Sequence, residues 1–180
     1  MAEIKSSLEL AMERTKKMSI SQEEREEIKR REIVQKANSL FHRSLEGHLS
    51  LNEILREIER MDEKTRAVVK EILLSQWIDS LSINGENEKL LEMIESLKGR
   101  GIDEVKQKLF QLISQYRKEK KEAEQEKRAL RIEALRREGI YGSAVDLDIE
   151  EDAEWKEWLE VIDQSFKGKI EEMKEILRKL

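Results

Sequence analysis

The sequence predicts an all-α protein, and three features of its composition lead to that prediction. Charged residues make up 42% of the 180-residue chain, against about 25% in an average globular protein. The chain has no proline, so nothing in it forbids long uninterrupted helices. It has 7 glycines and 4% aromatic residues, whereas β-sandwiches, β-barrels and glycine-rich phosphate-binding folds use both more freely.

The same composition excludes several classes of function. Without cysteine there is no disulfide framework, no thiolate zinc site and no cysteine nucleophile. A net charge of -5 gives no overall attraction to nucleic acid or anionic lipid. Residues 1–20 contain no apolar run, and no stretch of the chain approaches the roughly 18 uncharged apolar residues of a membrane span. We therefore expect a cytoplasmic protein that has no membrane partner.

Two helices are expected in the first quarter of the chain. In residues 3–18, apolar and small side chains recur at spacings of three and four on one narrow stripe. Ser21 and Glu24 have the spacing of a capping box, which predicts a second helix that ends at Gly47. Its first half, residues 22–31, has Ile28 as its one apolar residue. We expect that half to project into solvent or to meet a partner, as part of an N-terminal helical extension over residues 1–32.

The centre of the chain predicts a small helical core over residues 33–113. Ser50 and Glu53 repeat the capping box, and Asp62 can cap the following helix. Further helices are expected at 63–81, where Trp77 is a core residue, and at 88–98. Asn84-Gly85 separates these two, and the Gly99-Arg100-Gly101 turn ends the second.

Two long helices are expected after the core. The pattern over 103–138 contains no glycine or proline and predicts a helix about 54 Å long, which exceeds the diameter of a compact domain of this size. After a connector at 139–148, a last helix runs to Leu180. Its apolar residues follow coiled-coil spacing at seven of these eight positions: Trp155, Leu159, Ile162, Phe166, Lys169, Met173, Ile176 and Leu180.

The charges of these helices predict a protruding, coiled-coil-like antiparallel hairpin over residues 103–180. Residues 117–137 carry nine basic and five acidic side chains, whereas 146–160 carry eight acidic and one basic. Folding about the connector brings these stretches together, with position 131 near 156. In that register the residues from Trp155 to Phe166 lie beside polar residues, so we expect a second chain or the N-terminal helix to cover them.

Catalytic and metal-binding patterns are sparse. His42 and Glu46 have the i, i+4 spacing of a partial divalent-metal site, but a further ligand would have to come from elsewhere. Asp146, Asp148, Glu150 and Glu157 match a calcium-loop count, but Glu151 stands where that loop needs glycine. Phosphate-loop, dinucleotide and nucleophile-elbow motifs are missing. We expect no metal, no cofactor and no enzyme activity, although a bundle enzyme built on dispersed carboxylates stays open.

The aromatic and apolar residues of the last helix are the main functional clue. They predict a non-catalytic interaction or assembly protein, scaffold or adaptor, that forms a dimer or binds another protein. The predicted interface residues are Trp155, Trp158, Leu159, Ile162 and Phe166. The alternative is a helical arm that binds nucleic acid through the basic stretch 117–137, with phosphate contacts from Arg128, Arg131, Arg136 and Arg137. That alternative is disfavoured because acidic residues interrupt the stretch and Tyr116 is the one aromatic ring nearby.

The first residues also carry a resemblance. The segment from Ala2 to Glu13, AEIKSSLELAME, resembles the start of a family of short, uncharacterised, all-helical bacterial proteins. The resemblance covers about the first seventeen residues and contains no chemical motif. It implies a bacterial origin and brings no activity with it.

Overall fold

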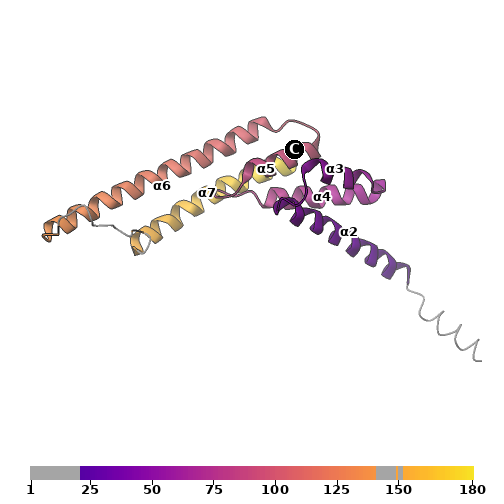
Figure 1. The fold of residues 1–180 in the computed structure, drawn as a ribbon, viewed down its shortest axis with the longest axis horizontal. Helices are drawn as coiled ribbons and strands as arrows, with labels where there is room; N and C mark the ends of the chain where they lie inside the picture. The colour runs from indigo at the N-terminus through magenta and orange to yellow at the C-terminus, as the bar shows by residue number, and fades with distance from the viewer. Residues whose placement is uncertain (1–20, 141–148, 150–151) are drawn as a thin grey trace, which may run out of the picture. The chain divides into compact units, whose positions relative to one another are not determined.

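The computed structural model describes residues 21–140, 149 and 152–180, and in these residues every regular element is a helix. The all-α prediction is therefore confirmed. The chain divides into two compact units at Leu73/Leu74, inside a helix, whereas the sequence pattern placed residues 33–113 in one core. The predicted first helix, residues 3–18, lies outside the described residues. The helices are α2 (Gln22–Leu45), α3 (Leu51–Glu59), α4 (Glu63–Asp79), α5 (Asn87–Lys98), α6 (Asp103–Arg137) and α7 (Ala153–Lys179) (Figure 1).

Both predicted capping boxes are present in the first unit. The Ser21 hydroxyl accepts from the Glu24 backbone N–H at 3.1 Å, and the Glu24 carboxylate accepts from the Ser21 N–H at 2.8 Å. Ser50 and Glu53 make the same reciprocal pair at the start of α3. Each box satisfies two backbone groups that a helix start would otherwise leave unpaired. The two helix starts are therefore determined locally by the sequence.

The first unit buries only part of each helix. In α2, Ala37, Leu40 and Ser44 are buried, while residues 21–32 are exposed, as predicted. The helix continues without a break through residue 32, where the sequence pattern had placed a domain boundary. After Gly47, at φ 75°, the chain turns into α3, which buries Ile54 and Ile58.

The α4 helix begins at its predicted cap and contains Trp77, which is fully buried, as predicted. The Asp62 carboxylate accepts from the Thr65 N–H at 3.1 Å. Beyond the end of α4, the Asn87 side chain bonds to both the N–H and the carbonyl of Ser82, at 3.0 and 2.6 Å. This two-bond clip closes the turn that contains Gly85 and leads the chain into α5.

The α5 helix is the most apolar part of the second unit. Its buried side chains are Leu90, Leu91, Met93, Ile94 and Leu97, together with Asn87 at its start. Gly99 ends the helix in the left-handed conformation, at φ 65°. Lys106 pairs with Glu95 and so joins the first turn of α6 to the end of α5.

The end of α4 is bound by α7, about a hundred residues later in the chain. The Lys174 ammonium, only 7% exposed, donates to the Asp79 carbonyl at 2.9 Å and to the Glu171 carboxylate at 2.8 Å. Arg178 pairs with the Asp79 carboxylate. Cations at the carboxyl end of a helix oppose its dipole and satisfy its last carbonyls. None of the helices in the described residues is long and apolar enough to cross a membrane.

Candidate interaction surface

The α6 and α7 helices lie side by side and run antiparallel (Figure 1). The Tyr116 hydroxyl donates to the Asp163 carboxylate at 2.7 Å, and its ring meets the Phe166 ring edge-on, with centroids 5.3 Å apart. Further along, Lys127 pairs with Asp152, at 3.4 Å, and with Glu154. In these contacts, residues with higher numbers in α6 meet residues with lower numbers in α7, as antiparallel pairing requires.

This register corrects the sequence-based one. Position 131 was expected near 156, which would put Phe166 beside polar residues of α6. The structure instead moves the pairing by about one and a half to two helical turns, so that Phe166 meets the ring of Tyr116. The physical reason is burial: an aromatic ring gains more from an apolar neighbour than the exposed ion pairs used for the prediction can supply.

The buried stripe of α7 also departs from the predicted seven-residue repeat. Trp155 and Phe166 belong to both stripes, but the buried stripe then continues through Ile170, Lys174 and Leu177. Ile176 and Leu180, predicted to be inside, are 38% and 41% exposed. Trp155, Phe166 and Leu177 are eleven residues apart, which is close to three turns of a straight helix. In a straight helix, residues spaced by seven drift steadily around the helix axis, so a strict seven-residue stripe does not stay on the side that faces α6.

The helix pair is closed near Tyr116 and loosely packed toward the connector. The closed half buries Val105, Leu109, Ile113 and Tyr116 of α6. We call the other half, residues 117–137 of α6 and 153–162 of α7, the distal segment. On its α6 side, the inner positions are Lys120, Ala123 and Lys127, all half-buried, and Leu130, 59% exposed.

The predicted interface residues therefore fall into two groups. Trp155 and Phe166 are buried within the chain, at 5% and 2% exposure. Trp158, Leu159 and Ile162 are half-buried in the distal segment. The structure thus assigns the first two residues to the interior of the chain and leaves the other three partly exposed.

A shallow hollow marks the loosely packed region. It has a volume of about 260 Å³ and is lined by Ala123, Glu126, Lys127, Leu130, Glu154, Trp155 and Trp158. The two tryptophan rings stack with centroids 5.0 Å apart and planes at 12°. Stacked indoles beside an exposed leucine form an apolar surface that water covers poorly.

Charges border this hollow. The bond to Glu154, followed by that to Asp152, raises the pKa of Lys127 above its ordinary value. The Asp152 carboxylate caps α7 by accepting from the Trp155 N–H at 3.1 Å, and that bond, ahead of Lys127, lowers the Asp152 pKa. Lys127 is therefore a cation held between two carboxylates at the start of α7, which fixes the α6–α7 register at this end.

The predicted nucleic-acid contacts lie along α6 and are partly neutralised there. Arg128 bonds to Glu124 at 3.1 Å, and Arg137 pairs with Glu133. Arg131 lines a hollow of about 510 Å³ between α6 and the start of α7, and Arg136 is exposed. The four arginines thus do not gather into one cationic cluster.

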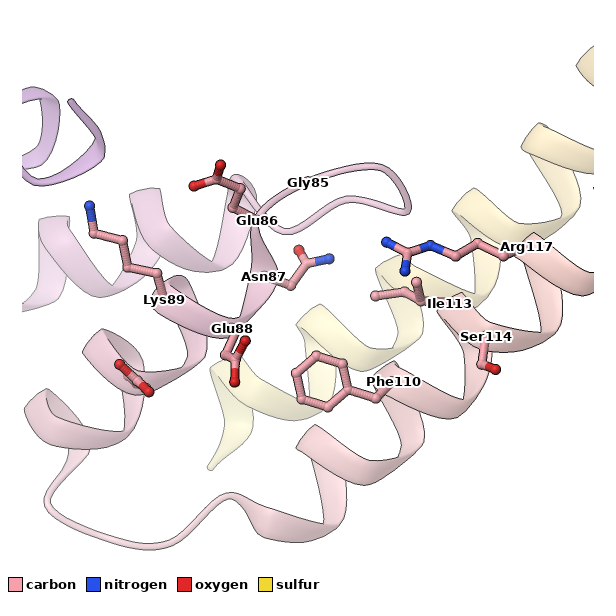
Figure 2. Close-up of a pocket in the computed structure, with 10 residues that line it drawn as sticks. Gly85, Glu86, Asn87, Glu88, Lys89, Phe110, Ile113, Ser114 and Arg117 are labelled. Carbon is pink, nitrogen blue, oxygen red and sulfur yellow. The ribbon is translucent and has the colours of Figure 1, made fainter. Parts of the chain in front are cut away.

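Sequence reasoning missed a third hollow, of about 710 Å³, between the start of α5 and the first half of α6. Figure 2 shows Phe110, Ile113, Ser114 and Arg117 projecting from α6, with Arg117 extending toward the α5 side. Phe110 is 43% exposed although it is aromatic. Its position beside Leu109 in an apolar stretch hid this exposure in the sequence, because only the helix orientation shows which neighbour faces inward.

In the described residues, the sequence patterns that suggested metal binding do not form a metal site. His48 lies 3.4 Å from Glu46, and His42 stacks edge-on against Phe41. In the part of the chain that the structure describes, no three histidine or carboxylate groups could hold a metal ion together. Of the calcium-loop residues, Asp146, Asp148, Glu150 and Glu151 lie outside that part.

Comparison of the chain with protein-family models, with curated proteins and with solved structures found no match. The resemblance of residues 2–13 to a bacterial family therefore stays a prediction. The function has to be argued from the surface itself.

Proposed function

We propose that this chain is a non-catalytic helical interaction and assembly protein of the cytoplasm, which self-associates as a dimer through the distal segment. The observation that carries the proposal is the incomplete cover of α7. Trp158, Leu159 and Ile162 are half-buried, and the facing inner positions of α6 are lysine, alanine and an exposed leucine. A pair of helices cannot enclose such residues alone, whereas a bundle of four can.

Burial supports the choice of this surface. Exposed aromatic and aliphatic residues at one place usually mark a contact with another macromolecule, and tryptophan is enriched at the centre of such contacts. The distal segment also exposes Leu130, at 59%, and Val161, at 68%. The apolar residues thus continue outward from the hollow onto the outer side of α7.

The nucleic-acid alternative has less support. A phosphate-binding arm needs cations that are free to contact successive phosphates. In the described residues, Arg128 and Arg137 already bond to glutamates of their own helix, and Lys127 is held between two carboxylates. Binding of RNA or DNA that is tight at low salt and weakens steeply with added salt would reverse this preference.

The proposal is tested by molar mass. Light scattering over a dilution series should show a dimer for the unmodified chain and a monomer for the double variant Leu159→Asp/Ile162→Asp. Phe166 is left unchanged because an aspartate there would disrupt its contact with Tyr116. The matched control is Gln111→Asp/Ser114→Asp, which adds the same charge at two exposed positions of α6 that lie outside the distal segment and have the same i, i+3 spacing, and it should remain a dimer. An unmodified chain that is monomeric throughout would contradict the proposal.

A further inference from the structure

One face of α7 begins at Trp158, on the rim of the hollow beside α6, continues onto the exposed outer side of the helix and combines large and small residues. Trp158, Val161, Ser165 and Gly168 follow one another at helical spacings of three, four and three, so they share a side of the helix. Val161 is the most exposed of the large apolar residues in the described chain, at 68%. Within the part of the chain that the structure describes, burial does not account for an aliphatic side chain in that position.

Gly168 adds an independent observation on the same face. It lies in the middle of a 27-residue helix, where glycine is the least favourable residue after proline. A Cβ atom built at Gly168 would meet nothing within 4 Å, so no packing inside the chain requires the small residue. A glycine that the fold does not need, beside an exposed valine, is typical of a site where another helix approaches closely.

The order of sizes along this face makes it complementary to itself. The large residues, Trp158 and Val161, come first, and the small ones, Ser165 and Gly168, follow. When two copies of α7 cross antiparallel, Trp158 of each lies level with Gly168 of the other, and Val161 with Ser165. Every large side chain then meets a small one, and the two-fold axis repeats each contact on the other side of the dimer. This is an isologous contact, in which both copies use the same surface.

The charges of α7 favour the same arrangement. Its first part, residues 153–163, has four acidic side chains and one basic, whereas residues 164–179 have five basic and three acidic. Antiparallel pairing brings the acidic part of one helix against the basic part of the other, and parallel pairing would bring like charges together. In the large-to-small register, Glu157 lies level with Lys169 of the second copy, whereas Glu154 lies level with Glu172 at the two ends of the contact, so the favourable pairing comes from the flanks and the net charge of the two parts.

From these observations we propose that the occupant of this face is a second copy of the chain, with its α7 helix antiparallel and Trp158 seated over Gly168 of the partner. This inference rests on the proposed function: it keeps the self-association that involves Trp158 in the distal segment and adds that the contact continues along α7 to Gly168. It assigns the contact to the Val161–Gly168 side of α7, next to the side that faces α6.

The decisive variant is Gly168→Leu. Leucine is a better helix former than glycine and meets open space in the single chain, so the variant should fold at least as stably as the original. The leucine side chain occupies the space above residue 168 that Trp158 of the second copy would fill. The dimer dissociation constant should therefore rise at least tenfold. Lys167→Leu is the control, because it places the same side chain at an exposed position of α7 away from this face and should leave the constant within about threefold.

Helix direction is measured separately. The chain contains no cysteine, so a single Glu175→Cys variant carries one spin label. Antiparallel pairing in this register separates the two labels by about 36 Å along the helix axis, whereas parallel pairing keeps them level. A dimer that is unaffected by Gly168→Leu, or labels within about 20 Å, would overturn the inference while the proposed self-association stands. A chain that is monomeric at every concentration would overturn both.

Discussion

Truncation of Phe166 to alanine should cost about 3–5 kcal/mol of unfolding free energy, as for other buried phenylalanines. The ring is 2% exposed and packs edge-on against Tyr116, so its removal leaves a cavity and ends an aromatic pair. For a chain of this length, each kcal/mol corresponds to about 2–4 °C in melting temperature, so the midpoint should fall by roughly 6–20 °C.

Thermal unfolding followed by far-UV circular dichroism measures this effect, at protein concentrations that differ by about a hundredfold. Since the contact lies within one chain, the loss should be the same at both concentrations. Val34→Ala is the control, because that side chain is 40% exposed and lies outside the proposed interface, so its truncation should change stability by at most about 0.5 kcal/mol at either concentration. A Phe166→Ala chain that melts normally when dilute and loses stability only when concentrated would refute the reasoning and place the ring between chains.

Two further predictions concern Tyr116 and Gly99. Burial, followed by the bond to Asp163, raises the pKa of Tyr116 above its ordinary value of 10.0. The contribution of Tyr116 to the free energy of unfolding should therefore be fully present below about pH 10. It should be lost as the pH rises above that value, because the unfolded chain then releases a proton that the folded chain keeps. Urea unfolding across this range should show that Tyr116→Phe reduces the loss, and an unchanged pH dependence would count against the assignment. Gly99→Ala should cost about 1–2 kcal/mol, because φ is 65° there while the added methyl group meets nothing. Gly99→Asn should cost less on thermal unfolding, and equal costs would show that conformational strain is not the cause.

The helix starts could be predicted from the sequence because their determinants are local. A serine and the glutamate three residues later contain both partners of a capping box, and both boxes formed. The end of α5 at Gly99 is equally local, since glycine adopts the left-handed conformation with little strain. No information from distant parts of the chain was needed for these elements.

The α6–α7 register could not be predicted in the same way, because it depends on residues far apart in the sequence. Net charges of two stretches indicated antiparallel pairing but did not fix its register, which differs from the predicted one by about one and a half to two turns. The choice was made by Tyr116, whose ring and hydroxyl meet Phe166 and Asp163. An eleven-residue repeat through Trp155, Phe166 and Leu177 was the available signal, and counting in sevens concealed it.

The candidate interface was predicted only in part for a related reason. An apolar residue at helical spacing indicates a contact but not whether that contact lies within the chain. The sequence grouped Phe166 with Trp158, yet one is buried against α6 and the other is half-buried. Val161 and Gly168 lie outside the predicted seam, so only the orientation of α7 relative to α6 draws attention to them.

The contact between α7 and the end of α4 has a consequence for synthesis in the cell. Lys174 and Arg178 reach Asp79 across 95 and 99 residues of chain, so the end of α4 is completed only after α7 has been made. Until then, the apolar side chains in the first half of α6 lack the helix that later packs beside them. A ribosome that slows between residues 103 and 153 would hold this unit open, so the nascent chain should engage chaperones there more than during synthesis of the first seventy residues.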